Sequence, residues 1–332
     1  MRALWALSRH LASYHAAVEI LFLGRAEVER LLDLDQLIEA LAVAFKELSS
    51  GRAAVPPRTA AVVHGSGLLA SMPGYLPGAG LEAKLVSVFA GNHARGLPSH
   101  QAIIALFDEQ DGRPLAVMDG THITATRTAA ATALSVKLLA RTNARSLAIL
   151  GAGVQGAQHL QAVTRVHDFA DVRVASRDIA HAQRLTATHP HAQVAANFEV
   201  AARMADVICC CTDASSPILD RDWLAPGTHI TSVGSNTDGP ELDRGTVTAG
   251  LLVVESRVAF SAPPAGSAEL VGLDPGFATE IGEILLGHHP GRERADQITV
   301  YKSMGHAVED IAAARLVYDR ARQVGAGQTV EF

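Results

Sequence analysis

Hydrophobic residues recur at intervals of three and four between Arg25 and Ser50, which predicts one amphipathic helix over 25–50. Gly51 follows as a helix stop. Alternating and short apolar runs then predict strands at 58–64, 68–72, 82–89, 101–107 and 113–118. The last two strands are joined through Asp111-Gly112, a pair typical of tight turns. The first third of the chain is therefore predicted to be a strand-rich α+β unit.

The pattern returns to helix at 123–141 and then changes to a continuous apolar run at 146–150 that ends in glycine, as buried parallel strands do. Further strands are predicted at 171–176, 206–211, 228–233, 251–255 and 298–302, between helices near 154–165, 178–187 and 197–204. This alternation predicts a doubly wound parallel sheet in an α/β fold. The final predicted helix, 306–323, follows the last strand and is free to pack on the first unit.

Composition narrows the class of protein. The chain has 332 residues, of which 48% are hydrophobic and 19% charged, so a folded enzyme of about two domains is expected. A net charge of −6 without a basic cluster argues against a nucleic-acid partner. The three cysteines are consecutive, Cys209–Cys211, and cannot form a disulfide framework, which fits a reducing cytoplasm.

Targeting and membrane segments are not expected. The longest uncharged stretch, 59–81, is interrupted by glycines and prolines, so it is interpreted as strand and loop instead of a membrane span. Residues 1–18 lack the apolar core and cleavage site of a secretion signal and are interpreted as an N-terminal extension.

A glycine-rich loop follows the predicted strand 146–150 and carries the spacing G-x-G-x-x-G. Its residues are Gly151, Gly153, Val154, Gln155 and Gly156, with Ala152 between the first two glycines. In the strand-to-helix context, the first glycine permits a tight turn, the second lets a pyrophosphate approach the backbone and the third lets helix and strand touch. The helix N-terminus offers free N–H groups to the phosphates. The loop therefore predicts dinucleotide binding.

The end of the second strand of this unit bears on which dinucleotide binds. NAD enzymes place an acidic residue there, on the ribose 2′-hydroxyl, whereas this chain has Ser176 followed by Arg177. A hydroxyl and a guanidinium suit a 2′-phosphate, so NADP(H) is favoured over NAD(H). The alternative is that Asp178 supplies the acid, or only caps the next helix.

The order of these segments resembles the ornithine cyclodeaminase/mu-crystallin family. The motifs that carry the resemblance are Lys84, 119–121, 126–130, 151–156, 233–236, 241–243, 302–305 and 309–310. The resemblance implies a homodimer with a Rossmann dinucleotide-binding domain over 123–305. It also implies a substrate-binding and dimerisation domain over 19–122 with 306–332, to which the C-terminal helix returns. Residues 1–18 precede both domains.

The family resemblance also implies a small amino-acid-like substrate whose carboxylate meets Arg58, Lys84 and Arg127. An imine or iminium carbon next to that carboxylate exchanges hydride with the nicotinamide. Arg127 is expected in the first turn of helix 123–141, where the helix dipole adds to its charge. Lys84 lies among apolar residues, so partial burial beside arginines is expected to lower its pKa and suit it to proton exchange. Without the resemblance, each cation is better explained as a surface residue.

Asn236 is the informative departure from the family pattern, because the matching position of ornithine cyclodeaminases is an aspartate. An amide orients a substrate but is not a base at neutral pH. We therefore predict Lys84 and Asn236 as the catalytic pair of an NAD(P)H-dependent reductase of a carboxylated cyclic imine or ketimine. Ornithine cyclodeaminase, an alanine-dehydrogenase-like enzyme and a non-catalytic nucleotide-binding protein are the alternatives.

Further residues match family positions around the nucleotide. These are Ser99, Thr212, Val233 and Ser303, the last expected to open the terminal helix beside the nicotinamide. The 15 histidines show no ligand-like spacing, so no metal site is expected.

Overall fold

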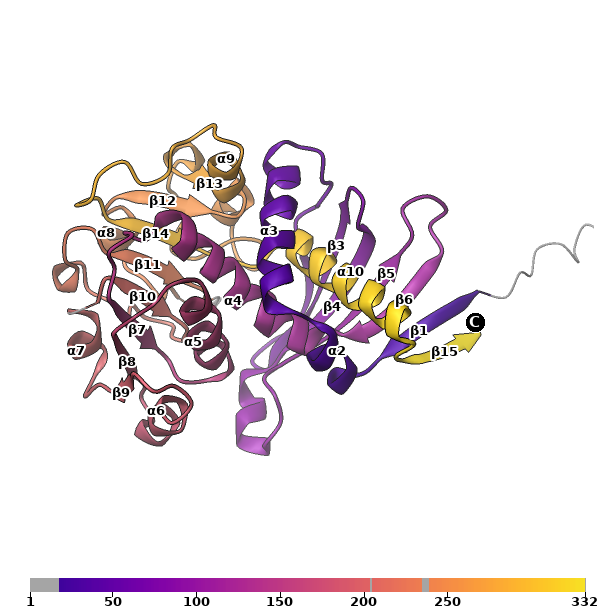
Figure 1. Cartoon of the computed structure of the whole chain (residues 1–332), viewed down its shortest axis with the longest axis horizontal. Coiled ribbons are helices and arrows are strands. Elements are labelled where there is room, and N and C mark those ends of the chain that lie inside the picture. The colour runs from indigo at the N-terminus through magenta and orange to yellow at the C-terminus, as the bar shows by residue number, and fades with distance from the viewer. Residues whose placement is uncertain (1–17, 204, 235–238, 332) are drawn as a thin grey trace, which may run out of the picture.

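The computed structural model describes residues 18–203, 205–234 and 239–331, which form two units joined by a long helix (Figure 1). The first unit is a seven-stranded sheet with helices on one face, and the second is an eight-stranded parallel sheet. The predicted α/β class and the doubly wound parallel sheet are both confirmed.

The N-terminal sheet has the strand order β15-β1-β6-β5-β4-β3-β2. Its elements are β1 (Glu19–Leu23), α2 (Arg25–Leu31), α3 (Leu34–Ser49), β2 (Thr59–Val63), β3 (Gly67–Leu76), β4 (Gly80–Val88), η1 (Ala90–Arg95), β5 (His100–Phe107) and β6 (Pro114–Asp119), with α10 (Ala307–Val324) and β15 (Gln328–Glu331) from the C-terminus. Helices α3 and α10 lie side by side over one face (Figure 1). Their buried side chains, such as Phe45 and Ile311, meet Ile104 and Leu106 of the sheet in one core.

The second unit has the strand order β13-β12-β14-β11-β10-β7-β8-β9, and every pairing is parallel. Its elements are β7 (Ser146–Leu150), α5 (Val154–Val166), β8 (Asp171–Ala175), α6 (Ile179–Thr186), β9 (Ala192–Val194), α7 (Phe198–Ala202), β10 (Val207–Cys210), η2 (Arg221–Trp223), β11 (His229–Ser232), α8 (Arg244–Val247), β12 (Leu251–Val254), η3 (Arg257–Phe260), η4 (Pro275–Phe277), β13 (Thr279–Glu280), α9 (Ile281–Leu285) and β14 (Thr299–Lys302). The chain runs outward from β7 to β9 and returns at β10, so the switch point lies between β7 and β10. Ligands bind in open α/β sheets at such a point.

Helix α4 (Gly120–Leu139) connects the two units and is buried along most of its length. Its alanines and threonines are short side chains, which lets α3, α5 and α10 approach it from different sides. Because α4 is buried on nearly all sides, it has no polar face.

Several boundaries differ from the predictions. The helix predicted over 25–50 is two helices, because Asp33 interrupts it and caps α3 by accepting a hydrogen bond from Gln36 N, 2.9 Å away. Strands β1 and β15 were not predicted, because each is short and is stabilised by pairing with a distant segment. Helix α4 begins at Gly120, where Asp119 accepts from His122 N. Arg127 is therefore two turns inside the helix, and the prediction that the helix dipole reinforces it is wrong.

Among the described residues, no helix combines the length and hydropathy needed to span a bilayer. In the same part of the chain, no cluster of three or more His, Cys, Asp or Glu side chains has the geometry of a metal site. All three cysteines are buried free thiols.

Candidate active site

The glycine loop leaves β7 and enters α5 with the geometry that a pyrophosphate needs. Gly151 has a φ of +105°, and a Cβ there would lie 2.6 Å from the carbonyl oxygen of Cys211. A Cβ on Gly156 would lie 2.0 Å from the carbonyl oxygen of Gly151, so both positions exclude side chains. Gly153, the N-cap of α5, has no atom within 4 Å of the place of a Cβ. This open position, at a helix N-terminus with free N–H groups, fits a dinucleotide.

The ribose end of the loop lies at the end of the neighbouring strand β8. Gly151 N donates to the carbonyl of Ala175, 2.8 Å away, which brings Ser176 next to the glycine loop. Ser176 is half-buried and Arg177 is exposed. Asp178 caps α6 by accepting from Ala180 N, 2.9 Å away, so its carboxylate is already used in the helix cap.

Glu241 ties together the loops at the carboxyl ends of β10 and β11. Its Oε1 accepts from both N and Oγ1 of Thr212, each 2.7 Å away. Its Oε2 accepts from Ser232 Oγ at 2.7 Å and Gly234 N at 2.9 Å. The hydroxyl of Thr212 is thus engaged within the protein, and Val233 lies between two of these donors. The role of Glu241 was missed in the sequence because its donors come from two separate segments, at the ends of β10 and β11.

A buried lysine, Lys302, also contacts the residues that hold these loops. Lys302, at the end of β14, lies with its Nζ 3.1 Å from Glu269 Oε1 and donates to Gly234 O at 2.5 Å. Glu269 also accepts from Glu241 N at 2.7 Å. Burial opposes ionisation of Glu269, but Lys302 and these hydrogen bonds outweigh it and lower the pKa of Glu269. Asn236, predicted as a catalytic residue, lies outside the described residues.

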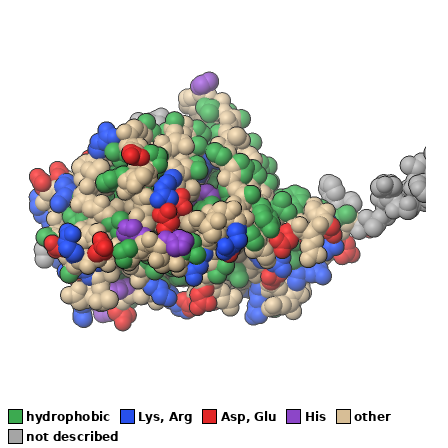
Figure 2. All heavy atoms as spheres, turned by 90° about the horizontal axis from the view of Figure 1, so that it is seen from above, with side chains coloured by type: hydrophobic (Ala, Val, Ile, Leu, Met, Phe, Trp, Pro, Cys, Tyr) green, Lys and Arg blue, Asp and Glu red, His purple; other side chains and the backbone are tan. Residues whose placement is uncertain are grey.

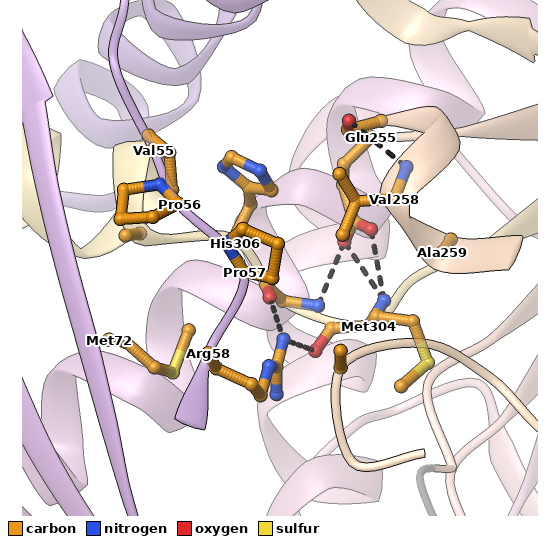
Figure 3. A pocket seen from close by; sticks show the side chains of 14 residues that line it. Val55, Pro56, Pro57, Arg58, Met72, Glu255, Val258, Ala259, Met304 and His306 are labelled. Carbon is orange, nitrogen blue, oxygen red and sulfur yellow. Dashed lines mark hydrogen bonds between the residues drawn. The ribbon is translucent and has the colours of Figure 1, made fainter. Parts of the chain in front are cut away.

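The segment that crosses from the Rossmann sheet back to α10 is held from two sides (Figure 3). Glu255, after β12, accepts from Ser303 Oγ at 2.5 Å, Met304 N at 2.9 Å and Gly305 N at 3.0 Å. From the N-terminal unit, Arg58 donates to the carbonyls of Met304, at 2.9 Å, and Gly305. Ser303 does not open the terminal helix as predicted, because α10 begins only at Ala307 after this segment.

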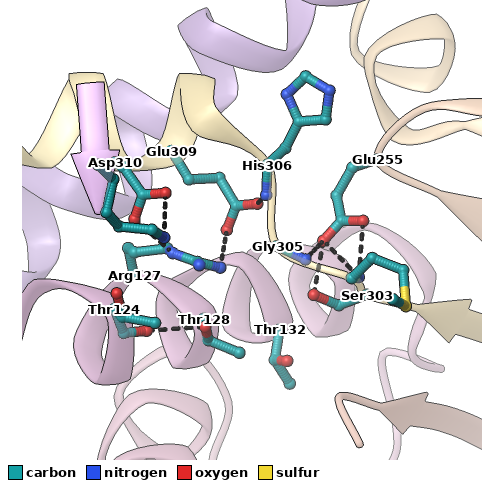
Figure 4. Close-up of polar contacts among 12 residues, drawn as sticks. Thr124, Arg127, Thr128, Thr132, Glu255, Ser303, Gly305, His306, Glu309 and Asp310 are labelled. Carbon is teal, nitrogen blue, oxygen red and sulfur yellow. Dashed lines mark hydrogen bonds and ion pairs between the residues drawn. The ribbon is translucent and has the colours of Figure 1, made fainter. Parts of the chain in front are cut away.

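Lys84, Arg127, Glu309 and Asp310 form a buried charged cluster, and Figure 4 shows how Arg127, Glu309 and Asp310 lie in it. Lys84 Nζ lies 2.5 Å from Asp310 Oδ2, and Arg127 Nε lies 3.0 Å from Asp310 Oδ1. Arg127 Nη1 lies 3.2 Å from Glu309 Oε2. Lys84 is only 1% exposed. Two cations predicted from separate segments, on β4 and α4, thus meet on one carboxylate of α10.

Burial and neighbouring charges set the pKa values in the charged cluster. Burial lowers the pKa of Lys84, and Arg127 lowers it further, against the opposing effect of Asp310. This direction matches the one expected from the sequence. Burial raises the pKa of Glu309 to about 8, although Arg127 favours its charged form. His100, a neighbour that the sequence analysis missed, has its pKa lowered to about 4 by burial and by the charges of Lys84 and Arg127.

A small cavity lies between the two units, beside the crossing segment (Figure 3). Its volume is about 30 Å³, about the share of liquid volume that one water molecule occupies. Arg58, Met72, Glu255 and His306 line it, whereas Lys84 and Arg127 do not. His306 Nδ1 is buried and has no hydrogen-bond partner among the residues that the structure describes. Ser99 does not line the cavity either. It directly precedes β5, and its carbonyl accepts a hydrogen bond from Phe89 N at 2.8 Å.

The parallel sheet with its glycine loop, together with a buried lysine and two arginines at the junction of the two units, defines a nicotinamide-nucleotide-dependent oxidoreductase. The chain belongs to the ornithine cyclodeaminase/mu-crystallin family, whose model matches residues 18–325. The family resemblance seen in the sequence is thereby confirmed.

Three similar proteins show how fully the match extends. Ketimine reductase mu-crystallin of Mus musculus is 39% identical over 306 residues, covering 90% of this chain and 96% of the relative. The structure of Thermococcus litoralis Δ1-pyrroline-2-carboxylate reductase with NADH and L-proline has a TM-score of 0.89 at 35% identity, covering 94% of this chain and 100% of that one. An archaeal alanine dehydrogenase dimer with bound NAD has a TM-score of 0.86 at 31% identity, covering 95% and 99%.

Proposed function

We propose that the protein reduces a small cyclic imine or ketimine that carries a carboxylate next to the C=N bond. The observation that carries this proposal is the buried charged cluster, in which Lys84 and Arg127 share Asp310. Because burial raises the pKa of Glu309 to about 8, the two cations face one ionised carboxylate, that of Asp310, at neutral pH, and positive charge is left for an anionic substrate. The names of the mouse and Thermococcus relatives support the same substrate class.

The side chains of the site have different roles in this proposal: the arginines bind the substrate carboxylate and the lysine transfers a proton. The planar guanidinium groups of Arg58 and Arg127 suit bidentate binding of a carboxylate. A bound nicotinamide nucleotide supplies the hydride when the imine is reduced. Lys84, whose pKa is lowered, gives its proton to the substrate nitrogen and recovers it from solvent. Arg58 turns from the carbonyls of Met304 and Gly305 to reach the substrate.

Asn236 favours reduction over ornithine cyclisation in this proposal. An amide orients the substrate nitrogen but does not take up its proton at neutral pH. Asn236→Asp should leave imine reduction active and introduce slight conversion of ornithine to proline and ammonia. Wild-type protein that converts ornithine faster than any carboxylated imine would contradict this ranking.

NADP(H) is the proposed preferred nucleotide. Arg177 is exposed beside the glycine loop, and Asp178 is engaged in its helix cap. An exposed guanidinium next to the ribose favours a 2′-phosphate, and the end of β8, where NAD enzymes place an acid, carries Ser176. We also place the enzyme in a reducing compartment, the cytoplasm, because its cysteines are free thiols.

A homodimer through the outer face of the N-terminal sheet completes the proposal. This face, opposite α3 and α10, exposes Leu69, Leu85 and Ile103, which are 49%, 40% and 53% accessible. They are close neighbours across the sheet, because Leu85 pairs with Ile103 and Leu69 lies opposite Ser87. Figure 2 shows hydrophobic side chains gathered along the upper right of the molecule and charged ones along its lower margin. Contiguous apolar surface of this kind marks a protein interface.

One experiment tests the proposed reaction. Cyclic imines, and 2-oxo acids with ammonia or methylamine, are offered to the purified protein while NADPH absorbance is followed. We expect net NADPH consumption that is fastest with an imine bearing a carboxylate, and slower with the same ring lacking it. Turnover only with pyruvate and ammonia would favour an alanine dehydrogenase, and nucleotide binding without turnover would contradict an enzyme. Sedimentation of the same sample at the mass of one 34.8 kDa chain would refute the dimer.

A further inference from the structure

Glu82 is a buried acid that the proposed reaction does not use. It lies on β4, is 3% exposed, and points to the same face of the sheet as Lys84, two residues further on. Its partners across the sheet are Gly74 on β3 and Leu106 on β5, neither of which offers a side-chain donor. Both carboxylate oxygens are buried without a hydrogen-bond partner among the described residues. Buried polar groups in folded proteins are normally paired, so this arrangement calls for an explanation.

The charged groups around Glu82 come from three elements. Lys84 is on its own strand, Arg127 is on α4, and Asp310 is on α10, each within electrostatic range. Glu309 adjoins Asp310 on the same helix and faces Arg127. Asp310 is already bonded to Lys84 and Arg127, and within the described part of the chain neither cation is hydrogen-bonded to Glu82.

These surroundings favour the neutral form of Glu82. Burial raises its pKa well above the ordinary value, and the negative charge of Asp310 raises it further, against the opposing effects of Lys84 and Arg127. A carboxylic acid without donors is less costly to bury than a carboxylate without donors.

We propose that Glu82 is an uncharged carboxylic acid that acts as a positioning residue behind Lys84, keeping the charged cluster positive for a substrate carboxylate. At neutral pH Lys84 and Arg127 carry two positive charges and Asp310 one negative charge, while burial, which raises the pKa of Glu309 to about 8, keeps that acid mainly neutral; one positive charge is left for the substrate. Ionisation of Glu82 cancels that charge and weakens substrate docking without any movement of the chain. The inference rests on the proposed function for the identity of the substrate, but the protonation of Glu82 is measurable without turnover.

The first test reads protonation directly. The infrared spectrum of the nucleotide-loaded protein at neutral pH should contain a carboxylic acid carbonyl band that Glu82→Gln diminishes and that Glu309→Gln, the other acid with a raised pKa, diminishes separately. Glu39→Gln, which removes an exposed carboxylate from α3, is the matched control and should leave the band in place. A difference spectrum that shows loss of a carboxylate band instead would mean that Glu82 is ionised, and the proposal would be overturned.

The pH dependence of the free energy of unfolding reports the same protonation state, because proton binding by Glu82 is linked to folding. An acid whose pKa is raised by folding stabilises the folded state fully below its unfolded pKa, and this contribution is lost as pH rises toward the folded pKa. The wild-type free energy of unfolding should therefore fall between the ordinary pKa of a glutamate and that of folded Glu82. Glu82→Gln should lose the part of this slope that Glu82 contributes, leaving that of Glu309, and Glu82→Leu, which is also neutral, should lose the same part. A slope unchanged in both variants would overturn the proposal.

The second part, substrate docking, is tested by the pH dependence of KM for the carboxylated imine that the wild type reduces best. Wild-type KM should rise by up to about tenfold for each pH unit above the pKa of Glu82, with kcat less affected. In Glu82→Gln this rise should be absent until Lys84 itself loses its proton. Glu309→Gln is measured alongside, because Glu309 also has a raised pKa and faces Arg127. A rise that survives in Glu82→Gln and disappears in Glu309→Gln would assign the ionisation to Glu309. If no imine is reduced at all, the proposed function fails, and the infrared and unfolding data still decide whether Glu82 is neutral.

Discussion

The glycine loop and the charged cluster form the two ends of the candidate site, and they are built in different ways. The loop is one continuous segment, 151–156, whose backbone conformation and N–H groups form the nucleotide end. The charged cluster is made of side chains from β4, α4 and α10, and its ion pair between Lys84 and Asp310 joins residues 226 positions apart. One end therefore depends on local conformation and the other on the packing of the whole N-terminal unit.

This difference also shows in the energetics. The loop exposes backbone groups to solvent until a nucleotide binds, so it costs the folded protein little beyond its glycines. The charged cluster removes two cations and their partners from water, and such buried ion pairs rarely stabilise a protein more than apolar residues of the same size. A fold that retains this cluster retains it for chemistry, which makes the cluster the place where mutations should separate function from stability.

Lys84→Ala tests that separation and should have the largest effect. Loss of the proton donor should reduce kcat roughly 10²–10⁴-fold, while the Kd for NADPH stays nearly unchanged because the glycine loop is intact. Imine reduction and nucleotide fluorescence titration measure the two quantities. The control is Lys137→Ala, which removes an exposed lysine from α4.

The interpretation of Lys84→Ala depends on the variant remaining folded, because Asp310 loses one of its two cations. Breaking a buried ion pair costs about 3–5 kcal/mol of stability. Lys84→Met retains most of the buried side chain, so it serves as a second variant, and thermal unfolding is recorded for both. A folded variant of either kind with undiminished turnover would remove Lys84 from the mechanism.

The same contrast explains how much the sequence could predict. The glycine loop and the parallel sheet follow from local spacing and apolar runs, and both are predicted correctly, whereas the short edge strands β9 and β13 are not predicted. Lys84, Arg127 and Asp310 all lie in family motifs, but the pairing of Asp310 with both cations was not predicted, because it exists only once α10 returns to the first sheet. The contacts of Glu241 and Glu255 were missed for the same reason, since their partners include backbone N–H groups of other loops.

A pair of glycine variants tests the loop with an intermediate effect. Gly156→Ala places a Cβ 2.0 Å from the carbonyl oxygen of Gly151, so we expect a loss of roughly 1–3 kcal/mol in the free energy of unfolding. Gly153→Ala meets no atom within 4 Å and should leave stability unchanged or slightly higher. Its methyl group would still occupy the space of the pyrophosphate, so NADPH affinity should fall roughly tenfold to a hundredfold.

Thermal unfolding and nucleotide titration of the two glycine variants give opposite expected patterns. Gly156→Ala should lose stability and binding together, whereas Gly153→Ala should lose binding alone. Full NADPH affinity in a folded Gly153→Ala protein would show that the nucleotide does not approach this part of the loop, and the nucleotide end of the site would have to be placed elsewhere.

Arg177→Ala should have the smallest effect, because its guanidinium is exposed and an exposed charge interaction is weak in water. We expect NADPH affinity to fall about tenfold or less while NADH affinity stays the same, since only NADPH carries the 2′-phosphate. Raising the ionic strength should reduce the difference between the two nucleotides in the wild type and leave the variant nearly unaffected. Arg184→Ala, an exposed arginine on α6, is the matched control. A wild type that binds NADH more tightly than NADPH, or an unchanged ratio in Arg177→Ala, would return the ribose contact to Asp178 and to NAD(H).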